Sequence, residues 1–413
     1  MFRRDFIRTT MGAGLAAGLN LAWATASSVA GPAANVKPKY RAGVIGLGWT
    51  GLLYDLGRRS GERFDIDDAN RPTPLVEIQR RLHAHQHPGD EGLPQSYAEA
   101  LWQRPEVELV AGADRDRKRL DIFSQRYGIK AVYTDGVEMM QKEKLDVVAI
   151  CTNTKGRAFL TVKAAELGAK AIVTEKPMCH TLAEADAMVK ACADRGIPLC
   201  CGAITTTHPS FARAKALANS GAIGKTISIE AGGPNSQHQN WSYFLDSPAA
   251  WVVGTGDSVG NREFGGEGVL AAQSGLTVHF RNGAPGVRVT GTKGEIVFER
   301  QTLATHGAAW RWWQDIDFVS QLSNDWEPEK GTRRVEMPWP MPQFLYPYAA
   351  VYAVDDVLAC LEGKLDEPKN SGRRVAVALE VEIAMKESSR QGSKRVDLPL
   401  ADRSLGLEYA WFR

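Results

Sequence analysis

The sequence predicts an α/β protein in which a doubly wound parallel sheet is followed by a second domain of further strands and two helices. A strand that runs directly into a glycine-rich turn is the first observation behind this prediction. The second is a series of short β-branched runs that alternate with helical segments as far as residue 203. A length of 413 residues allows two to three domains and a sizeable core.

Residues 1–30 have the features of a targeting segment. Arg3 and Arg4 precede a weakly hydrophobic, Gly- and Ala-rich stretch, and Ala24-Thr25-Ala26 and Ser28-Val29-Ala30 are candidate cleavage sites. The pattern resembles twin-arginine signals, which direct export of folded proteins. We therefore expect a periplasmic or otherwise exported protein that uses the twin-arginine export machinery. Polar residues and glycine dilute the apolar run, so we expect no stable membrane insertion.

Composition excludes several other classes of partner. The formal net charge is +2, which gives no reason to expect nucleic acid or an anionic membrane surface. The six cysteines form no CxxC pair and lie mostly in apolar or helical runs. We expect them to be small buried residues rather than a disulfide framework or a zinc site.

The glycine-rich turn predicts a dinucleotide site. The strand Tyr40–Ile45 leads into Gly46-Leu47-Gly48-Trp49-Thr50-Gly51, whose glycines allow a tight turn and close backbone approach to a pyrophosphate. An acidic residue should end the next strand and accept hydrogen bonds from the adenosine ribose. Asp114 ends the run 108–113, but it lies 68 residues beyond Gly46, against the roughly 20 residues expected.

An insertion at about 52–94 explains the excess. It is polar and rich in turn residues, and it carries His83, His85 and His87, which would share one face of an extended strand. No carboxylate or cysteine is patterned with them, so we expect no metal site. A solvated loop and a flap over the site both remain open.

The alternation of strands and helices continues after Asp114. Strands are expected at 131–133, 146–150, 171–173 and 199–203, with helices at 120–127, 137–144, 159–167 and 182–195. Thr181 and Glu184 have the spacing of a helix capping box. The dinucleotide-binding domain is therefore expected to span residues 37–203.

Glu175-Lys176-Pro177 follows the strand 171–173 and is the candidate catalytic turn. Proline stops the strand, so a carboxylate and an amine stand at its carboxyl end, where open α/β sheets bind ligands. A partly desolvated lysine there can exchange a proton with a substrate hydroxyl. The alternative is a surface Glu-Lys pair in an ordinary turn.

The motifs in this order resemble the Gfo/Idh/MocA family, which includes glucose–fructose oxidoreductases and inositol dehydrogenases. The likeness rests on the glycine turn, Ala113-Asp114-Arg115-Asp116, Cys151-Thr152-Asn153 and Glu175-Lys176-Pro177. It continues through Ser220–Lys225 and Thr290–Glu295 to Val396–Leu400, so that it covers nearly all of the chain after the targeting segment. It implies a Rossmann domain and a C-terminal α+β domain, residues 204–413, with an open, mainly antiparallel sheet.

The resemblance also implies roles for particular residues. Lys176 would transfer the proton and, with Glu175, touch the nicotinamide. Asp114 would bind the adenosine ribose, with Arg115 on the adenine face. The remaining implied cofactor contacts are Gly46, Leu47, Gly48, Thr50, Gly51, Cys151, Thr152 and Asn153. The acid at position 114 favours NAD, while Arg115 leaves NADP open.

The second domain departs from the family pattern at one point. Members usually carry a motif near G-G-x-x-x-D-x-x-x-H, but the region Gly232–Trp241 lacks the Asp. His238 is the candidate for the second catalytic residue, and an ordinary polar loop histidine is the alternative. Aromatic residues crowd the segment 310–348, where they suit either stacking on sugar rings or a subunit contact. We expect a homodimer or homotetramer, because an open sheet covered on one face would leave an apolar face.

Three functions remain open from the sequence. The leading one is an exported NAD(P)-dependent oxidoreductase acting on a sugar, polyol or glycoside, with tightly held cofactor and redox-neutral turnover. The second is a glycoside hydrolase that uses NAD for transient oxidation, and the third is a non-catalytic sugar-binding protein. Intact Gly46, Asp114 and Lys176 argue against the third.

Overall fold

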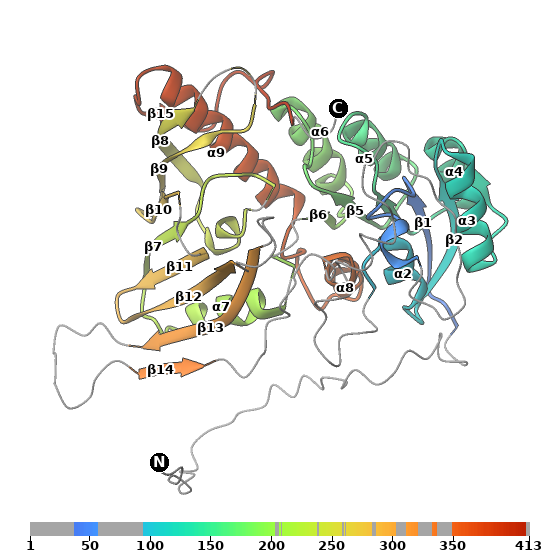
Figure 1. Cartoon of the computed structure of the whole chain (residues 1–413), viewed down its shortest axis with the longest axis horizontal. Coiled ribbons are helices and arrows are strands. Elements are labelled where there is room, and N and C mark those ends of the chain that lie inside the picture. Colours follow the sequence, from blue (N-terminus) through green and yellow to red (C-terminus); the bar gives the residue numbers. More distant parts are fainter. Residues whose placement is uncertain are drawn as a thin grey trace, which may run out of the picture.

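The computed structural model describes two sheets, each with its own core, joined by the C-terminal helices (Figure 1). The described residues are 37–56, 94–202, 206–207, 209–237, 239–257, 260, 262–282, 286–302, 311–320, 333–336 and 349–409. The targeting segment 1–30, the three histidines of the insertion and His238 lie outside these ranges.

The first sheet is parallel and has the strand order β3-β2-β1-β4-β5-β6, the order of dinucleotide-binding folds. Its strands are β1 Tyr40–Ile45, β2 Val107–Ala113, β3 Val132–Tyr133, β4 Val147–Ile150, β5 Ala171–Glu175 and β6 Leu199–Gly202. Its helices are α2 Tyr97–Trp102, α3 Arg117–Tyr127, α4 Gly136–Glu143, α5 Arg157–Glu166 and α6 Leu182–Ala193. The predicted parallel sheet is thus confirmed.

Local sequence sets the ends of these helices. Asp116 and Asp135 accept hydrogen bonds from the first-turn N–H groups of α3 and α4. The expected capping box is present on α6, where Thr181 and Glu184 bond each other's backbone. Gly128 closes α3 in the left-handed region, with φ of 69°.

The helix that should follow the glycine turn is divided by the insertion. Leu52 and Leu53 donate to Gly48 O, which forms its first turn, and a short 3₁₀ segment, η1 Leu53–Asp55, follows. After residues 57–93, which lie outside the described part, the N–H groups of Tyr97 and Ala98 donate to the carbonyls of Thr50 and Gly51 at 2.8 and 3.0 Å. Helix α2 therefore continues the first turn across the insertion.

A buried carboxylate joins the two ends of the insertion. Asp55 is fully buried and accepts hydrogen bonds from the N–H groups of Gln95 and Ser96 and from the Ser96 hydroxyl. Leu52, Leu56 and Pro94, expected to belong to the polar insertion, are instead buried. The insertion thus begins later than residue 52, because its first residues complete the helical turn.

The second sheet is mixed, with the order β14-β13-β12-β11-β7-β10-β9-β8-β15 and one parallel pair, β7 with β10. The strands are β7 Thr226–Ala231, β8 Ala249–Asp257, β9 Gly265–Ala272, β10 Thr277–Phe280, β11 Gly286–Gly291, β12 Gly294–Thr302, β13 Arg311–Ser320, β14 Arg333–Glu336 and β15 Val396–Asp397. The turn predicted at 290–295 joins β11 to β12. The expected open, mainly antiparallel sheet is therefore confirmed.

The remaining helices cover this sheet and tie it to the first. They are α7 Pro209–Asn219, the 3₁₀ segment η2 Trp241–Phe244, α8 Ala349–Leu361 and α9 Gly372–Arg390. Helix α9 packs on β8 and reaches α6 of the first domain (Figure 1). Helix α8 belongs by sequence to 204–413, yet its Ala350, Val354 and Val357 are buried in the core of the first sheet. The C-terminal segment thus returns to cover the dinucleotide domain.

Two further findings concern the described residues only. No helix among them has both the length and the apolar character needed to cross a membrane. The six cysteines are free; Cys179, Cys192, Cys200 and Cys201 are buried, as the sequence predicts, while Cys151 and Cys360 are only partly buried.

Candidate functional site

The carboxyl ends of β1, β2, β4 and β5 bring the predicted site residues to one edge of the first sheet. Ile45 lies beside both Ala113 and Ile150, and Ile150 lies beside Thr174. The next residues along the chain are therefore neighbours at this edge: Gly46, Asp114, Cys151 and Glu175.

The glycine turn has the shape that a pyrophosphate requires. Gly46 has φ of 88°, and a Cβ there would lie 2.8 Å from the backbone of Cys151. A Cβ at Gly51 would lie 1.9 Å from Gly46 O, so that only glycine fits. Gly48 instead faces open space, with Arg119 Nη1 at 3.8 Å as the single near atom among the described residues. The turn is thus packed against backbone at Gly46 and Gly51 and open at Gly48, which leaves room for a dinucleotide phosphate.

Asp114 stands beside this turn and organises it. Its carboxylate accepts the Leu47 N–H at 2.6 Å and the Asp116 N–H at 2.8 Å. A carboxylate offers about four acceptor positions, so capacity for a ribose hydroxyl remains.

Arg119 is a site residue that the sequence did not indicate. Its Nη1 lies 3.7 Å from Asp114 Oδ2, and its side chain is 20% exposed. Arg115, the expected adenine contact, is exposed. The first turn of α3 therefore brings Arg119, five positions after Asp114, next to the glycine turn.

The loop after β4 packs between the glycine turn and the catalytic turn. Cys151 N donates to Ile45 O at 2.7 Å, and burial raises the pKa of the Cys151 thiol well above its usual value. The Thr152 hydroxyl donates to Asn153 O at 3.0 Å. Cys151 is therefore a packing residue in thiol form, while Thr152 and Asn153 are partly exposed or exposed at the edge.

Arg157 holds the candidate catalytic turn, Glu175-Lys176-Pro177, in place. It is the first residue of α5 and is 1% exposed. Its guanidinium donates to the carbonyl oxygens of Glu175, at 2.7 Å, and of Pro177 and Thr152. One buried cation thus fixes the residues on both sides of Lys176, whose peptide bond to Pro177 is cis.

The Glu175 side chain turns back into the protein. It is 7% exposed, and its Oε2 accepts the Lys176 N–H at 3.1 Å. Burial raises the pKa of this carboxyl, against the opposing effect of Lys176 and Arg157. Its Oε1 and the Tyr97 hydroxyl both face Gly202, where a Cβ would lie 2.9 and 2.8 Å from them. Tyr97 is a second residue that the sequence did not indicate.

The loop 232–241 of the second domain is anchored to α9 and, through Asn370, to the first sheet. Glu382 of α9 is fully buried and accepts the N–H groups of Ser236 and Phe264 at 2.7 and 3.1 Å. Burial raises its pKa to about 7. Gln239 donates to Asn370 Oδ1 at 2.6 Å, and Asn370 O accepts the N–H of Cys201 in β6. The loop is therefore tied to the edge strand next to β5, while His238 lies outside the described residues.

Residues 92–202 match the model of an oxidoreductase family with an NAD-binding Rossmann fold, GFO_IDH_MocA. The match begins directly after most of the insertion. No group of three or more metal-binding side chains is present among the described residues.

Curated relatives match a stretch of the chain of similar length. A D-apiose dehydrogenase of Paraburkholderia graminis is 42% identical over 93 residues, which are 22% of this chain and 24% of that protein. The NAD⁺-dependent scyllo-inositol 2-dehydrogenase of Bacillus subtilis is 31% identical over 123 residues, 30% of this chain and 36% of that protein. The chain thus spans about a quarter to a third of the length of these relatives.

Solved structures share the whole two-domain fold. A levoglucosan dehydrogenase in complex with NADH and L-sorbose has a TM-score of 0.58 at 17% identity, covering 88% of this chain and 100% of that one. An oxidoreductase from Agrobacterium radiobacter in complex with NAD⁺, L-tartaric acid and magnesium has a TM-score of 0.55 at 18% identity, covering 87% and 98%.

Proposed function

We propose that the chain is a member of the Gfo/Idh/MocA oxidoreductase family, whose NAD-binding Rossmann model matches residues 92–202, and that it oxidises a hydroxyl group of a sugar or polyol. The observation that carries the proposal is Lys176, held at the carboxyl end of β5 by Arg157, on the same edge as the glycine turn. The sugar and inositol dehydrogenases among the relatives support the substrate class.

The proposed chemistry divides the work between cofactor and protein. A bound nicotinamide would supply the hydride acceptor, held by the glycine turn and Asp114. Lys176 Nζ, in its neutral form, takes the proton of the substrate hydroxyl as the C–H hydride leaves. The alcohol loses two electrons and becomes a carbonyl, and the lysine carries the released proton to water.

A panel assay tests this function. Purified protein with NAD⁺ is offered sugars, inositols and aryl glycosides, and reduced-cofactor absorbance and aglycone release are followed together. Reduction of the cofactor supports the proposal, and aglycone release without net reduction identifies a glycosidase that oxidises its substrate transiently. Absence of both and of any new sugar product by chromatography, with sugar binding in calorimetry, would leave a sugar-binding protein and reject the proposed enzyme.

Export and a retained cofactor are part of the proposal. The twin-arginine pattern at Arg3 and Arg4 supports export, and free nicotinamide cofactor is scarce outside the cytoplasm. An exported enzyme of this kind would be loaded before export and regenerate its cofactor in place, so that turnover is redox-neutral overall. The homodimer or homotetramer is likewise only proposed. The outward side chains described on the second sheet, such as Glu230, His279 and Arg288, are polar, so these residues do not supply the apolar face on which that prediction rests.

We predict that protein purified from the exported fraction without added cofactor releases a nicotinamide dinucleotide when denatured. Chromatography of the supernatant should find close to one dinucleotide per chain. Cofactor-free protein that turns over steadily only when NAD⁺ is supplied would identify a dissociable dehydrogenase instead. Asp114→Ala protein, which loses a ligand-facing carboxylate, is the matched control and should release less.

We also predict that NADH binds more tightly than NADPH, because the Asp114 carboxylate would repel a 2′-phosphate. Arg119, 3.7 Å from that carboxylate, partly offsets the repulsion. Arg119→Leu should therefore raise the preference for NADH about tenfold, whereas the exposed Arg115→Leu should change it less than about twofold. Fluorescence titration of cofactor-free protein measures both ratios, and NADPH binding as tight as NADH in the unaltered protein would contradict the prediction.

A further inference from the structure

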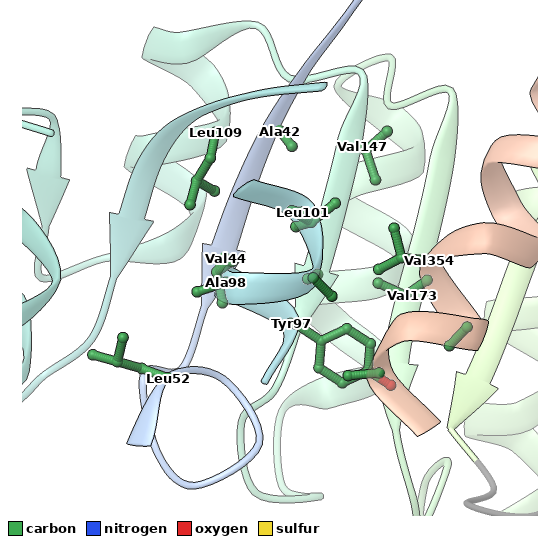
Figure 2. Packing of buried hydrophobic residues seen from close by; sticks show 14 of the residues in the cluster. Ala42, Val44, Leu52, Tyr97, Ala98, Leu101, Leu109, Val147, Val173 and Val354 are labelled. Carbon is green, nitrogen blue, oxygen red and sulfur yellow. The ribbon is translucent and has the colours of Figure 1, made fainter. Parts of the chain in front are cut away.

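Tyr97 links the phosphate loop to the catalytic turn, and nothing in the proposed chemistry yet uses it. Its backbone N–H bonds the Thr50 carbonyl in the glycine turn, and Asp55 anchors Ser96 directly before it. Its ring passes under α2 beside Val173 and Val354, in the core of the first sheet (Figure 2). The side chain is 1% exposed, so a buried phenol extends from the glycine turn to β5.

The hydroxyl at the end of that ring lies next to the second oxygen of Glu175. Glu175 Oε2 already bonds the Lys176 N–H, while Oε1 and Tyr97 Oη both crowd the position where Gly202 lacks a side chain. The hydroxyl has no geometrically complete hydrogen bond among the described residues. It nevertheless lies close to this carboxyl: burial raises the pKa of Tyr97 and the Glu175 carboxyl raises it further, while burial raises the pKa of Glu175 and the Tyr97 hydroxyl opposes that rise. Hydrogen bonds of catalytic sites are often long before ligands bind and shorten in the complex.

We propose that Tyr97 is a positioning residue of the catalytic turn: its hydroxyl donates to Glu175 Oε1, and through Glu175 it fixes the backbone from which Lys176 reaches the substrate. Glu175 in its ionised form accepts at both oxygens, from the Lys176 N–H and from Tyr97. Loss of either donor releases one end of the carboxylate. The inference rests on the proposed function for its role in turnover, but the interaction itself exists without a substrate.

The test follows the ionisation of Glu175 directly. Infrared difference spectra in D₂O across a pH titration monitor the protonated carboxyl band, and Glu175→Gln, which removes that band, assigns it. Tyr97→Phe should move the Glu175 titration upward by about one pH unit, because the ionised form loses a hydrogen-bond donor. The acidic limb of the turnover profile should move in the same direction.

Tyr127→Phe is the matched control. The Tyr127 hydroxyl also bonds a buried carboxylate of the first domain, at 3.0 Å, but that carboxylate is Glu99 of α2 and not Glu175 of the catalytic turn. The Tyr127→Phe variant should therefore leave the Glu175 titration unchanged. Gly202→Ala provides a second variant, since its Cβ would separate Tyr97 Oη from Glu175 Oε1, and it should shift the titration as Tyr97→Phe does.

The outcomes separate the two proposals. A Glu175 titration that does not move in Tyr97→Phe and Gly202→Ala, or moves equally in Tyr127→Phe, overturns the positioning role even if the enzyme is active. A titration that moves as expected in protein without hydride transfer supports the interaction while rejecting the proposed function.

Discussion

Replacing Lys176 by alanine should lower turnover by about a thousandfold or more while leaving NADH binding within about twofold of the unaltered protein. Proton transfer by a positioned side chain contributes roughly 10²–10⁴ to a rate, and no other amine in the described part of the chain stands on this turn. The backbone of the turn is held by Arg157 and by the Glu175 carboxylate, which the substitution leaves in place. The loss should therefore appear in kcat rather than in cofactor affinity.

The measurement combines initial rates with a fluorescence titration of NADH. Lys163→Ala is the control, because Lys163 lies on α5 in an exposed pair with Glu166 and should have no effect on turnover. Near-normal turnover in Lys176→Ala would remove the lysine from the reaction. A parallel loss of NADH binding would instead mean that Lys176 serves mainly to hold the cofactor.

Local sequence patterns are sufficient to predict the first sheet and the candidate site residues that directly follow its strands. The strand that enters the glycine turn, the acid at the end of β2 and the proline that stops β5 each depend on neighbouring residues. Gly46, Asp114 and Glu175 consequently reach the same edge, as expected from parallel strands. The capping box at Thr181 and Glu184 is predictable for the same reason.

The residues that surround these site residues, such as Tyr97 and Arg119, depend on contacts between residues far apart in the chain. Tyr97 follows a long insertion, and its place beside Glu175 comes from α2 continuing a helical turn that ends about 40 residues earlier. The insertion starts later than the residue 52 that the sequence predicts, because Leu52 and Leu56 are buried by a helical turn whose continuation, α2, lies beyond the insertion. Arg119 resembles any exposed residue of an amphipathic helix, since its neighbour Asp114 belongs to the preceding strand.

Arg157 is the clearest example of this limit. An arginine just before a predicted helix is ordinarily solvated, and no neighbouring residue in the sequence indicates that Arg157 would be a buried cation. It becomes buried because three carbonyl oxygens, from two loops at the sheet edge, converge where α5 begins. Burial lowers its pKa from the usual value, and the nearby Glu175 opposes that change. The role of this buried guanidinium is therefore to donate the three hydrogen bonds to these carbonyl oxygens.

Arg157→Met should therefore both destabilise the protein and disable the catalytic turn. Methionine fills much of the volume but leaves the carbonyls of Glu175, Pro177 and Thr152 without this donor, at a cost of about 1–3 kcal/mol for each buried one, so we expect a loss of about 3–5 kcal/mol in the free energy of unfolding. Turnover per folded molecule should fall about a hundredfold, because the turn that carries Lys176 loses its anchor. Urea denaturation and initial rates corrected for the folded fraction measure the two effects.

Arg126→Met separates stability from function. Arg126 is likewise buried, but its partner, at 3.2 Å, is the Glu99 carboxylate of α2 rather than the carbonyl oxygens of the catalytic turn. Removing the buried cation beside the Glu99 carboxylate should cost a similar 3–5 kcal/mol or so, while folded Arg126→Met should turn over at the normal rate. Arg157→Lys, which retains one or two of the donors, should recover part of the activity. Equal turnover in folded Arg157→Met and folded Arg126→Met would show that Arg157 stabilises the domain without holding the catalytic turn.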